Sequence, residues 1–250
     1  MKILLSLPLL LPLVTAQLPT PQACHDIHHF LARGTDESYP SFLGYLVDGV
    51  CSPILNAEVP DGTSCGYQDI IYPATFHEYC DSVLQGSTYA KAALKEYADR
   101  CPGSKTVLVG WSQGAQVLGD ALAGGGGHMP IVECEMAKSL PISSESPAAK
   151  QIKAIVFFGD TRHVKGEPYN AGSGASFNGV APRTSEMLAN LKKYSDVMQS
   201  YCNFGDPYCA TLSQPDANNT AQHEPDAYKE KHMEDAIGFV RRQIAIEYNT

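Results

Sequence analysis

The architecture of this chain is clearest in one segment, Lys105-Thr-Val-Leu-Val-Gly-Trp-Ser-Gln-Gly114. Its apolar run is typical of a buried parallel strand, and Gln113 to Ala123 then have the spacing of a helix. In Gly110-x-Ser112-x-Gly114 the two glycines allow a tight strand-to-helix turn, which side chains at 110 and 114 would crowd. A serine on such a turn has a strained backbone and an exposed hydroxyl. The segment predicts a nucleophilic serine; the alternative is a structural Gly/Ser turn.

Predicted strands and helices alternate along the rest of the chain. Apolar runs predict further strands at Ile27–Ala32, Asp69–Tyr72, Ile152–Phe158 and Asp196–Cys202. Helical spacing predicts helices over Phe42–Val50, Tyr89–Ala98 and Glu230–Tyr248, a helical turn near Glu186–Leu191 and a helix stop at Gly124–Gly127. Such alternation indicates a parallel sheet covered on both faces. We expect an α/β protein, a three-layer α/β/α sandwich with a central, mostly parallel five-stranded sheet.

The N-terminus and the composition favour a secreted, soluble protein. Lys2, the apolar run Ile3–Val14 and the small residue Ala16 have the pattern of a signal peptide over residues 1–16. Residues 17–250 are expected to form a single domain, because no linker or repeat divides them. The apolar run is too short to span a bilayer. A formal net charge of −9 argues against nucleic acid or an anionic membrane surface as a partner, and we expect a monomer.

The cysteines predict disulfide bonds. They number eight, at positions 24, 51, 65, 80, 101, 134, 202 and 209. An even count behind a signal peptide favours disulfides over metal or redox chemistry, and no His/Cys spacing matches a zinc site, so we expect no metal. His28 and His29 point to opposite faces of a strand and are interpreted as structural. Asn218 begins an N-glycosylation sequon, Asn-Asn-Thr220.

A serine nucleophile needs a histidine to take its proton and a carboxylate to orient that histidine. On α/β-hydrolase folds the carboxylate follows the serine and the histidine comes last. His223 is favoured, because it lies in a polar loop just before the last helix. The other histidines after Ser112 fit less well: His128 is expected to point away, His163 is too close to Asp160, and His232 is expected on the surface of a helix.

Two aspartates compete for the role of orienting carboxylate. Asp160 follows a strong strand, as Thr35 and Ser112 do, and ligand sites lie at the carboxyl ends of parallel strands. Asp206 lies in a short loop between Cys202 and Cys209, where a disulfide would fix its carboxylate. The residues alone favour Asp206, with Asp160 as the alternative. Weaker candidates are Asp216 and Asp226.

Together these motifs resemble a known family, the fungal cutinases and acetylxylan esterases of carbohydrate esterase family 5. The matching pieces are Ala32-Arg-Gly-Thr35, Tyr72-Pro-Ala74, Cys101-Pro102, Gly110-Trp-Ser-Gln-Gly114, Gly159-Asp160, Cys-x-x-x-Asp206-x-x-Cys209 and a histidine before the last helix. They span nearly all of the mature chain in the right order. One departure is Trp111, where the family more often has tyrosine.

The resemblance implies a role for each site residue. Ser112 would be the nucleophile, Asp206 the orienting acid and His223 the base, with the Thr35 hydroxyl and the Gln113 backbone N–H as the oxyanion hole. It implies a lid-free α/β hydrolase without metal or organic cofactor. It also pairs Cys24 with Cys101 and Cys202 with Cys209. Three pairings of the other four cysteines are possible, of which we favour Cys51–Cys65 with Cys80–Cys134.

The same resemblance implies a secreted serine carboxylesterase that acts on plant cell-wall esters. The segment 216–226 around His223 offers hydrogen-bonding groups, which suit an acetyl group on xylan better than a wax-like polyester. Phe76 and Tyr79 offer an apolar wall, so a cutinase acting on cutin is the alternative. A binding or effector protein without turnover is a third interpretation, disfavoured because all three triad residues are present.

Overall fold

The computed structural model describes residues 23–52, 62–213 and 219–246. The expected signal peptide, Asp216 and the sequon residue Asn218 lie outside these ranges. Within the described ranges, no helix combines the length and apolar character needed to cross a membrane.

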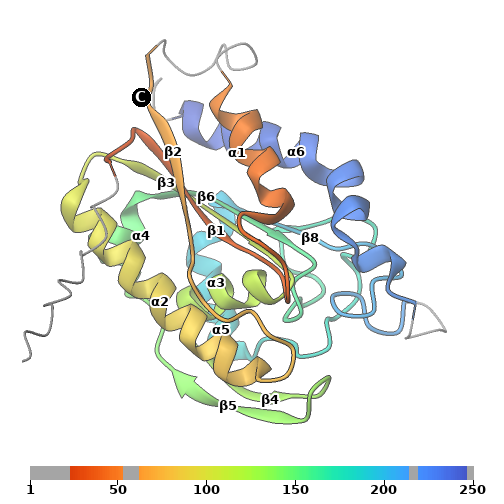
Figure 1. Ribbon diagram of the computed structural model, residues 1–250. Coiled ribbons are helices and arrows are strands. Elements are labelled where there is room, and N and C mark those ends of the chain that lie inside the picture. The colour runs from red at the N-terminus through yellow and green to blue at the C-terminus, as the bar shows by residue number, and fades with distance from the viewer. Residues whose placement is uncertain (1–22, 53–61, 214–218, 247–250) are drawn as a thin grey trace, which may run out of the picture.

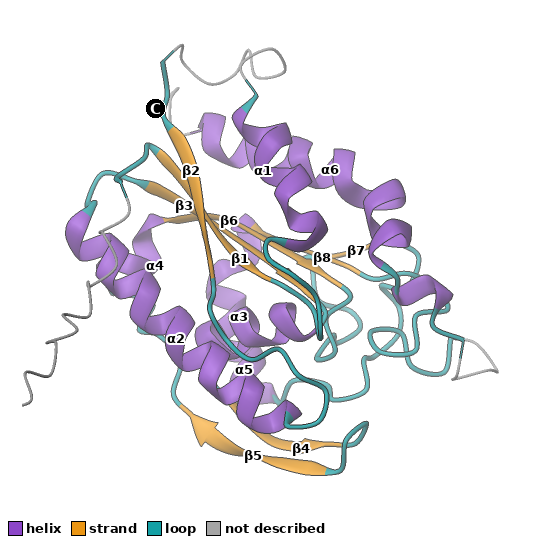
Figure 2. Cartoon of the chain, in the orientation of Figure 1, coloured by secondary structure: helices purple, strands orange, loops and turns teal. Residues whose placement is uncertain are grey.

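A central parallel sheet has six strands in the described residues, ordered β2-β1-β3-β6-β8-β7 (Figure 2). The strands are β1 (Ile27–Ala32), β2 (Cys65–Asp69), β3 (Lys105–Trp111), β6 (Ile152–Phe158), β7 (Asn170–Ala171) and β8 (Met198–Tyr201). The prediction of five strands was therefore one too few. The additional strand is β7, whose two residues are too few to show a period in the sequence.

Helices cover both faces of the sheet, as the alternation predicted (Figure 1). One layer contains α2 (Tyr79–Arg100), α3 (Gln113–Ala123), α4 (Pro147–Gln151) and α5 (Ser185–Leu191). The other contains α1 (Gly44–Cys51) and α6 (Pro225–Ile246). Side chains alternate between the two layers, so that Leu108 packs in one apolar cluster and its neighbours Val107 and Val109 in the other. The three-layer α/β/α sandwich is confirmed.

Several element boundaries differ from the prediction; α6, for example, begins at Pro225, five residues before the expected start at Glu230. The strand expected at Asp69–Tyr72 lies earlier, at Cys65–Asp69, and pairs only with β1. Because an edge strand is not buried on both sides, it needs no continuous apolar run. Helix α2 begins at Tyr79, ten residues before the expected start at Tyr89. Its first half buries small and polar side chains, including Ser82 and Gly86, which carry little apolar periodicity.

An antiparallel hairpin, β4 (Gly125–Met129) and β5 (Cys134–Ser139), follows α3 and was not predicted. The glycine run ends α3 as expected, but it then continues into β4. Glycines and charged side chains are depleted in strands, so this segment has no strand pattern.

Four disulfides cross-link the molecule, in the pairs expected above. They join Cys24 to Cys101, Cys51 to Cys65, Cys80 to Cys134 and Cys202 to Cys209. The third ties the β4–β5 hairpin to α2. The last closes a ring of chain around Asp206.

Candidate active site

Ser112 lies on a strained turn between β3 and α3, with φ 53° and ψ −117°. A Cβ atom on Gly110 would lie 2.7 Å from the Cα atom of Ala115, and one on Gly114 would overlap the carbonyl of Ala32. Only glycine fits at both positions, as the motif predicted. The turn places the serine hydroxyl at the wall of a cavity of about 290 Å³.

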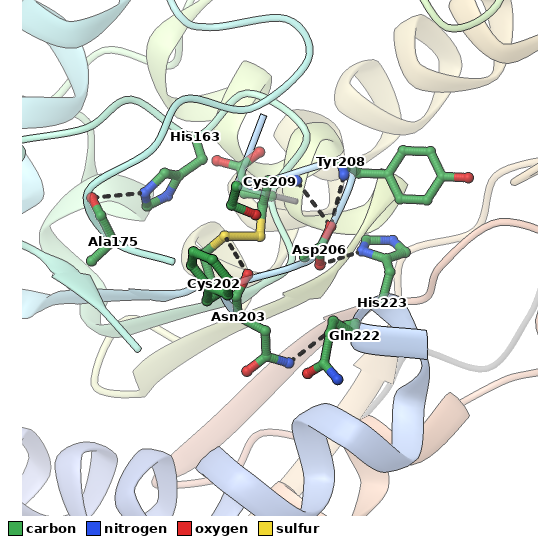
Figure 3. Close-up of a disulfide and its surroundings, with 12 residues drawn as sticks. His163, Ala175, Cys202, Asn203, Asp206, Tyr208, Cys209, Gln222 and His223 are labelled. Atoms are coloured by element: carbon green, nitrogen blue, oxygen red, sulfur yellow. Dashed lines mark hydrogen bonds and ion pairs between the residues drawn. A yellow bond between two sulfur atoms is a disulfide. The ribbon is translucent and has the colours of Figure 1, made fainter. Parts of the chain in front are cut away.

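His223 connects Ser112 to Asp206 through two hydrogen bonds. Its Nε2 lies 2.8 Å from the Ser112 Oγ and its Nδ1 lies 2.6 Å from the Asp206 Oδ2. The histidine ends a short 3₁₀ turn, Ala221–His223, that leads into α6. Figure 3 shows its ring pointing at the Asp206 carboxylate. The structure therefore brings together three of the residues that the sequence selected.

The Asp206 carboxylate is buried but surrounded by donors. Its Oδ1 accepts the backbone N–H groups of Tyr208 (2.7 Å) and Cys209 (3.0 Å), and its Oδ2 also accepts the Tyr228 hydroxyl (2.6 Å). Burial raises the pKa of Asp206, but the attraction of His223 and the hydrogen bonds outweigh burial and leave the pKa below its usual value. The carboxylate is therefore ionised, as a group that orients a histidine must be.

The side chain of Gln113 holds Thr35 beside the serine. Its Nε2 donates to the Thr35 Oγ1 (3.2 Å) and to the Thr75 carbonyl (3.1 Å), while its Oε1 accepts the Ser82 hydroxyl (2.8 Å). The Thr35 oxygen thus accepts a bond from the amide, and its own O–H can still act as a donor. The backbone N–H of Gln113 opens α3, where the first N–H groups have no partner within the helix.

The rest of the cavity wall combines polar and apolar side chains. It is lined by Thr35, Glu37, Phe76, Tyr79, Trp111, Ser112, Ile131, Thr161, Tyr208, His223, Glu224 and Pro225. The Tyr79 hydroxyl donates to the buried Gln116 Oε1 (2.9 Å), which also accepts the Thr161 hydroxyl (2.7 Å). Ile131 belongs to the β4–β5 turn and was missed with that hairpin. Thr161 follows Asp160 at the end of β6, a position where a site residue was expected.

Asp160, the alternative carboxylate, is not part of this arrangement. It forms a buried ion pair with Arg183, and its Oδ1 accepts the backbone N–H of Arg162 at 3.0 Å. Asp226 is exposed in the first turn of α6. The fourth candidate, Asp216, lies outside the described residues.

The other histidines lie away from the serine. His163 is buried with its Nε2 against the Ala175 carbonyl, as Figure 3 shows, and His128 pairs with Glu135 on the hairpin. His232 was expected on the surface but is half-buried, stacked on Tyr201.

One group of side chains has the composition of a metal site. The ligand atoms of His29, Cys51 and Cys65 lie within 4.8 Å of one another. The two cysteines form a disulfide, so neither offers the thiolate that binds zinc. His29 instead contacts the Gly66 carbonyl through Nδ1 at 3.2 Å.

The fold, the tight serine turn and the chain order Ser, Asp, His are those of an α/β hydrolase. A model of the family described as Cutinase matches residues 23–244. The chain is 29% identical to the acetylxylan esterase of Hypocrea jecorina over 229 residues, 89% of this chain and 68% of the relative. It is 32% identical to Cutinase 11 of Verticillium dahliae over 231 residues, 89% of this chain and 70% of the relative.

Among solved structures, the catalytic core domain of acetyl xylan esterase from Trichoderma reesei is similar, with a TM-score of 0.70 at 30% identity. That match covers 88% of this chain and 100% of the other. The chain belongs to the Cutinase family and has its α/β-hydrolase fold. It is a carboxylic ester hydrolase, as its relatives are.

Proposed function

We propose that the protein is a secreted serine esterase that removes acetyl groups from xylan through an acyl-enzyme. The observation that carries the proposal is the position of His223, whose two ring nitrogens contact the Ser112 hydroxyl and the Asp206 carboxylate. A hydroxyl becomes nucleophilic when an adjacent base takes its proton. A carboxylate beside Nδ1 holds the histidine's own proton on that nitrogen, so that Nε2 is free to take the proton of the serine.

The proposed reaction proceeds in two half-reactions. The Ser112 Oγ attacks the ester carbonyl while His223 Nε2 takes its proton, and the oxyanion that forms accepts bonds from the Thr35 hydroxyl and the Gln113 N–H. The C–O bond to the alcohol then breaks, and His223 gives its proton to the leaving oxygen. Water attacks the acyl-enzyme by the same route, which releases the carboxylic acid and restores the Ser112 hydroxyl.

The cavity supports a small acyl group on a polar alcohol. Glu37, Glu224 and Thr35 all line its wall, and the Thr220 hydroxyl donates to Glu224 at 3.2 Å. Such groups suit the hydroxyls of a sugar. Phe76, which is 48% exposed at the same wall, favours a cutinase acting on cutin polyester as the second candidate.

Secretion is part of the proposal. The four disulfides support it, because such bonds persist in oxidising compartments outside the cytosol. The N-terminal segment with Lys2 and Ala16 supplies the signal peptide in this account, and Asn218 is the proposed glycosylation site. We propose that the enzyme acts as a monomer without a cofactor.

The test combines two substrates with one variant. Acetate release from acetylated xylan is measured beside hydrolysis of p-nitrophenyl esters from acetate to palmitate, with Ser112→Ala as the control. Activity confined to short esters and to acetylated xylan, and abolished in Ser112→Ala, supports the deacetylase. Rates that hold or rise at butyrate and beyond, with release of cutin monomers, support the cutinase. A Ser112→Ala protein that retains its biological effect would instead favour a binding role.

A further inference from the structure

The first turn of α6 places Tyr228 against the carboxylate that orients His223. Pro225 opens the helix, a position at which its fixed φ is already helical, and Tyr228 follows three residues later. The Tyr228 side chain is fully buried, with its ring centroid 4.8 Å from that of Trp111. Histidine and tyrosine are therefore delivered by one continuous segment, five residues apart.

The partners of the Tyr228 hydroxyl determine the direction of its hydrogen bond. Its oxygen lies 3.2 Å from the backbone nitrogen of Asn203, which can only donate, and 2.6 Å from the Asp206 Oδ2, which can only accept when ionised. The nearby Cys209 sulfur belongs to a disulfide and carries no proton. The hydroxyl therefore accepts from Asn203 and donates its proton to Asp206.

This bond completes the donor set around Asp206. With two backbone N–H groups on Oδ1, and His223 and Tyr228 on Oδ2, each carboxylate oxygen accepts two hydrogen bonds. The oxygen that Tyr228 contacts is the one that receives the His223 Nδ1–H. Hydrogen bonds to an ionised acceptor are roughly twice as strong as neutral ones.

Asn203 connects the same tyrosine to the turn that carries His223. Its side-chain Nδ2 donates to the Gln222 carbonyl (3.0 Å), as Figure 3 shows, and its Oδ1 accepts from His232 Nε2 (2.9 Å). One buried residue thus holds both the tyrosine hydroxyl and the residue before His223. The geometry limits how far the histidine and Asp206 can separate.

We propose that Tyr228 is a positioning residue of the esterase, which holds the Asp206 carboxylate ionised and aimed at His223 Nδ1. The proposal rests on the proposed function of the Ser112, His223 and Asp206 site. The tyrosine bond stabilises the carboxylate more while His223 is neutral than when a positive imidazolium already neutralises it.

Removal of the Tyr228 hydroxyl therefore favours protonation of the pair and moves the acid limb of kcat/KM to higher pH. The other titratable groups near the pair are unchanged by the substitution. They are Tyr208, His163, His232, Asp160 and Glu224.

The experiment compares Tyr228→Phe with Tyr201→Phe as a matched control. Tyr201 is buried like Tyr228, and neither tyrosine lines the cavity, but the Tyr201 hydroxyl donates to a different carboxylate, Asp235 Oδ2 at 2.7 Å. With p-nitrophenyl acetate, Tyr228→Phe is expected to lower kcat about tenfold to a hundredfold with little change in KM, and to shift the acid limb upward. Tyr201→Phe is expected to change neither, although both variants lose thermal stability.

Two further measurements separate positioning from packing. In an Asp206→Asn background, removal of the Tyr228 hydroxyl should cost little further activity, because the tyrosine acts through Asp206. Difluorotyrosine at position 228 keeps the ring but is a stronger donor, and should shift the acid limb downward. An unchanged acid limb in both Tyr228 variants, or equal losses in Tyr228→Phe and Tyr201→Phe, overturns the proposal. Activity that survives in Ser112→Ala overturns the proposed function instead.

Discussion

The ring of Trp111 stacks on the ring of His223, with centroids 4.5 Å apart and an interplanar angle of 27°. Two glycines make this contact possible: a Cβ atom on Gly159 would lie 2.6 Å from Trp111 and 2.9 Å from His223, and one on Gly34 would meet the indole. The face of an aromatic ring attracts a cation. In the proposed mechanism, the indole would therefore stabilise the imidazolium that forms when His223 takes the serine proton.

Replacement of this indole should lower kcat, and an aliphatic side chain should lower it more than a smaller aromatic ring. A cation over an aromatic ring gains about 0.5 to 2 kcal/mol, so Trp111→Leu is expected to reduce kcat about two- to thirtyfold, and Trp111→Tyr less. Phe42→Leu serves as the control. Phe42 also packs on Trp111, with ring centroids 5.5 Å apart, but in an edge-on arrangement, whereas His223 stacks on the face of the indole. Equal kcat values for the leucine and tyrosine variants would rule out a role for the ring face.

Loss of two of the disulfides should separate stability from activity. The Cys202–Cys209 bond closes 7 residues and the Cys24–Cys101 bond closes 77. Chain-entropy arguments give about 2 kcal/mol for the short loop and about 4 to 5 kcal/mol for the long one. We expect the Cys24→Ala, Cys101→Ala pair to lower the free energy of unfolding more, and the Cys202→Ala, Cys209→Ala pair to lower kcat more, because the short ring holds Asp206.

Denaturant unfolding and kcat measured on both double variants check this ranking. If the variant without the Cys202–Cys209 bond keeps full kcat, the ring does not position Asp206.

Shortening Ile131 should extend the range of acyl groups that the cavity accepts. Ile131 reaches the cavity from the β4–β5 turn, which the Cys80–Cys134 bond fixes to α2. One or two methylenes in an apolar site change specificity by about tenfold or more. We expect Ile131→Ala to raise the ratio of kcat/KM for butyrate over acetate about tenfold. Leu140→Ala, 76% exposed in the following loop, should leave the ratio unchanged. The same ratio in both variants would show that the acyl group does not contact Ile131.

Acid should destabilise the protein partly through His28. The pKa of His28 is lowered to about 4, mainly by burial, which outweighs the raising effect of the Gln68 bond, with smaller lowering effects of His29, His25 and Arg100. The folded pKa lies below the unfolded value of 6.5, so stability is present above pH 6.5 and is lost as the pH falls toward 4. The loss amounts to about 3 kcal/mol.

His28→Phe removes this titrating group while it keeps a ring against Tyr97, whose centroid lies 4.0 Å away. Urea unfolding between pH 8 and pH 4.5 should show a smaller loss of stability in the variant than in the wild type. A constant difference between the two proteins over this range would contradict the assignment to His28. Asp120, whose pKa burial raises to about 6, titrates in both proteins and cancels in the comparison.

The sequence predicted the parts of the site that depend on local sterics. Gly110 and Gly114 can be interpreted without a structure, because the chain itself crowds any side chain there. The loop with Asp206 was recognisable from its flanking cysteines. The β4–β5 turn was not, because glycines and charges carry no strand period, and Ile131 was missed with it. The contacts of Trp111 and Tyr228 depend on packing between β3 and α6, which no local pattern encodes.

The proposed reaction requires that His223 activates the Ser112 hydroxyl as a nucleophile. Reaction with diethyl p-nitrophenyl phosphate, followed by mass spectrometry of the intact protein and its peptides, tests it directly. We expect one diethylphosphoryl group, on the peptide that contains Ser112, gained in step with the loss of esterase activity. Ser112→Ala should take no label and His223→Ala should react far more slowly. A label on another residue, or inactivation without a label on Ser112, would contradict the account.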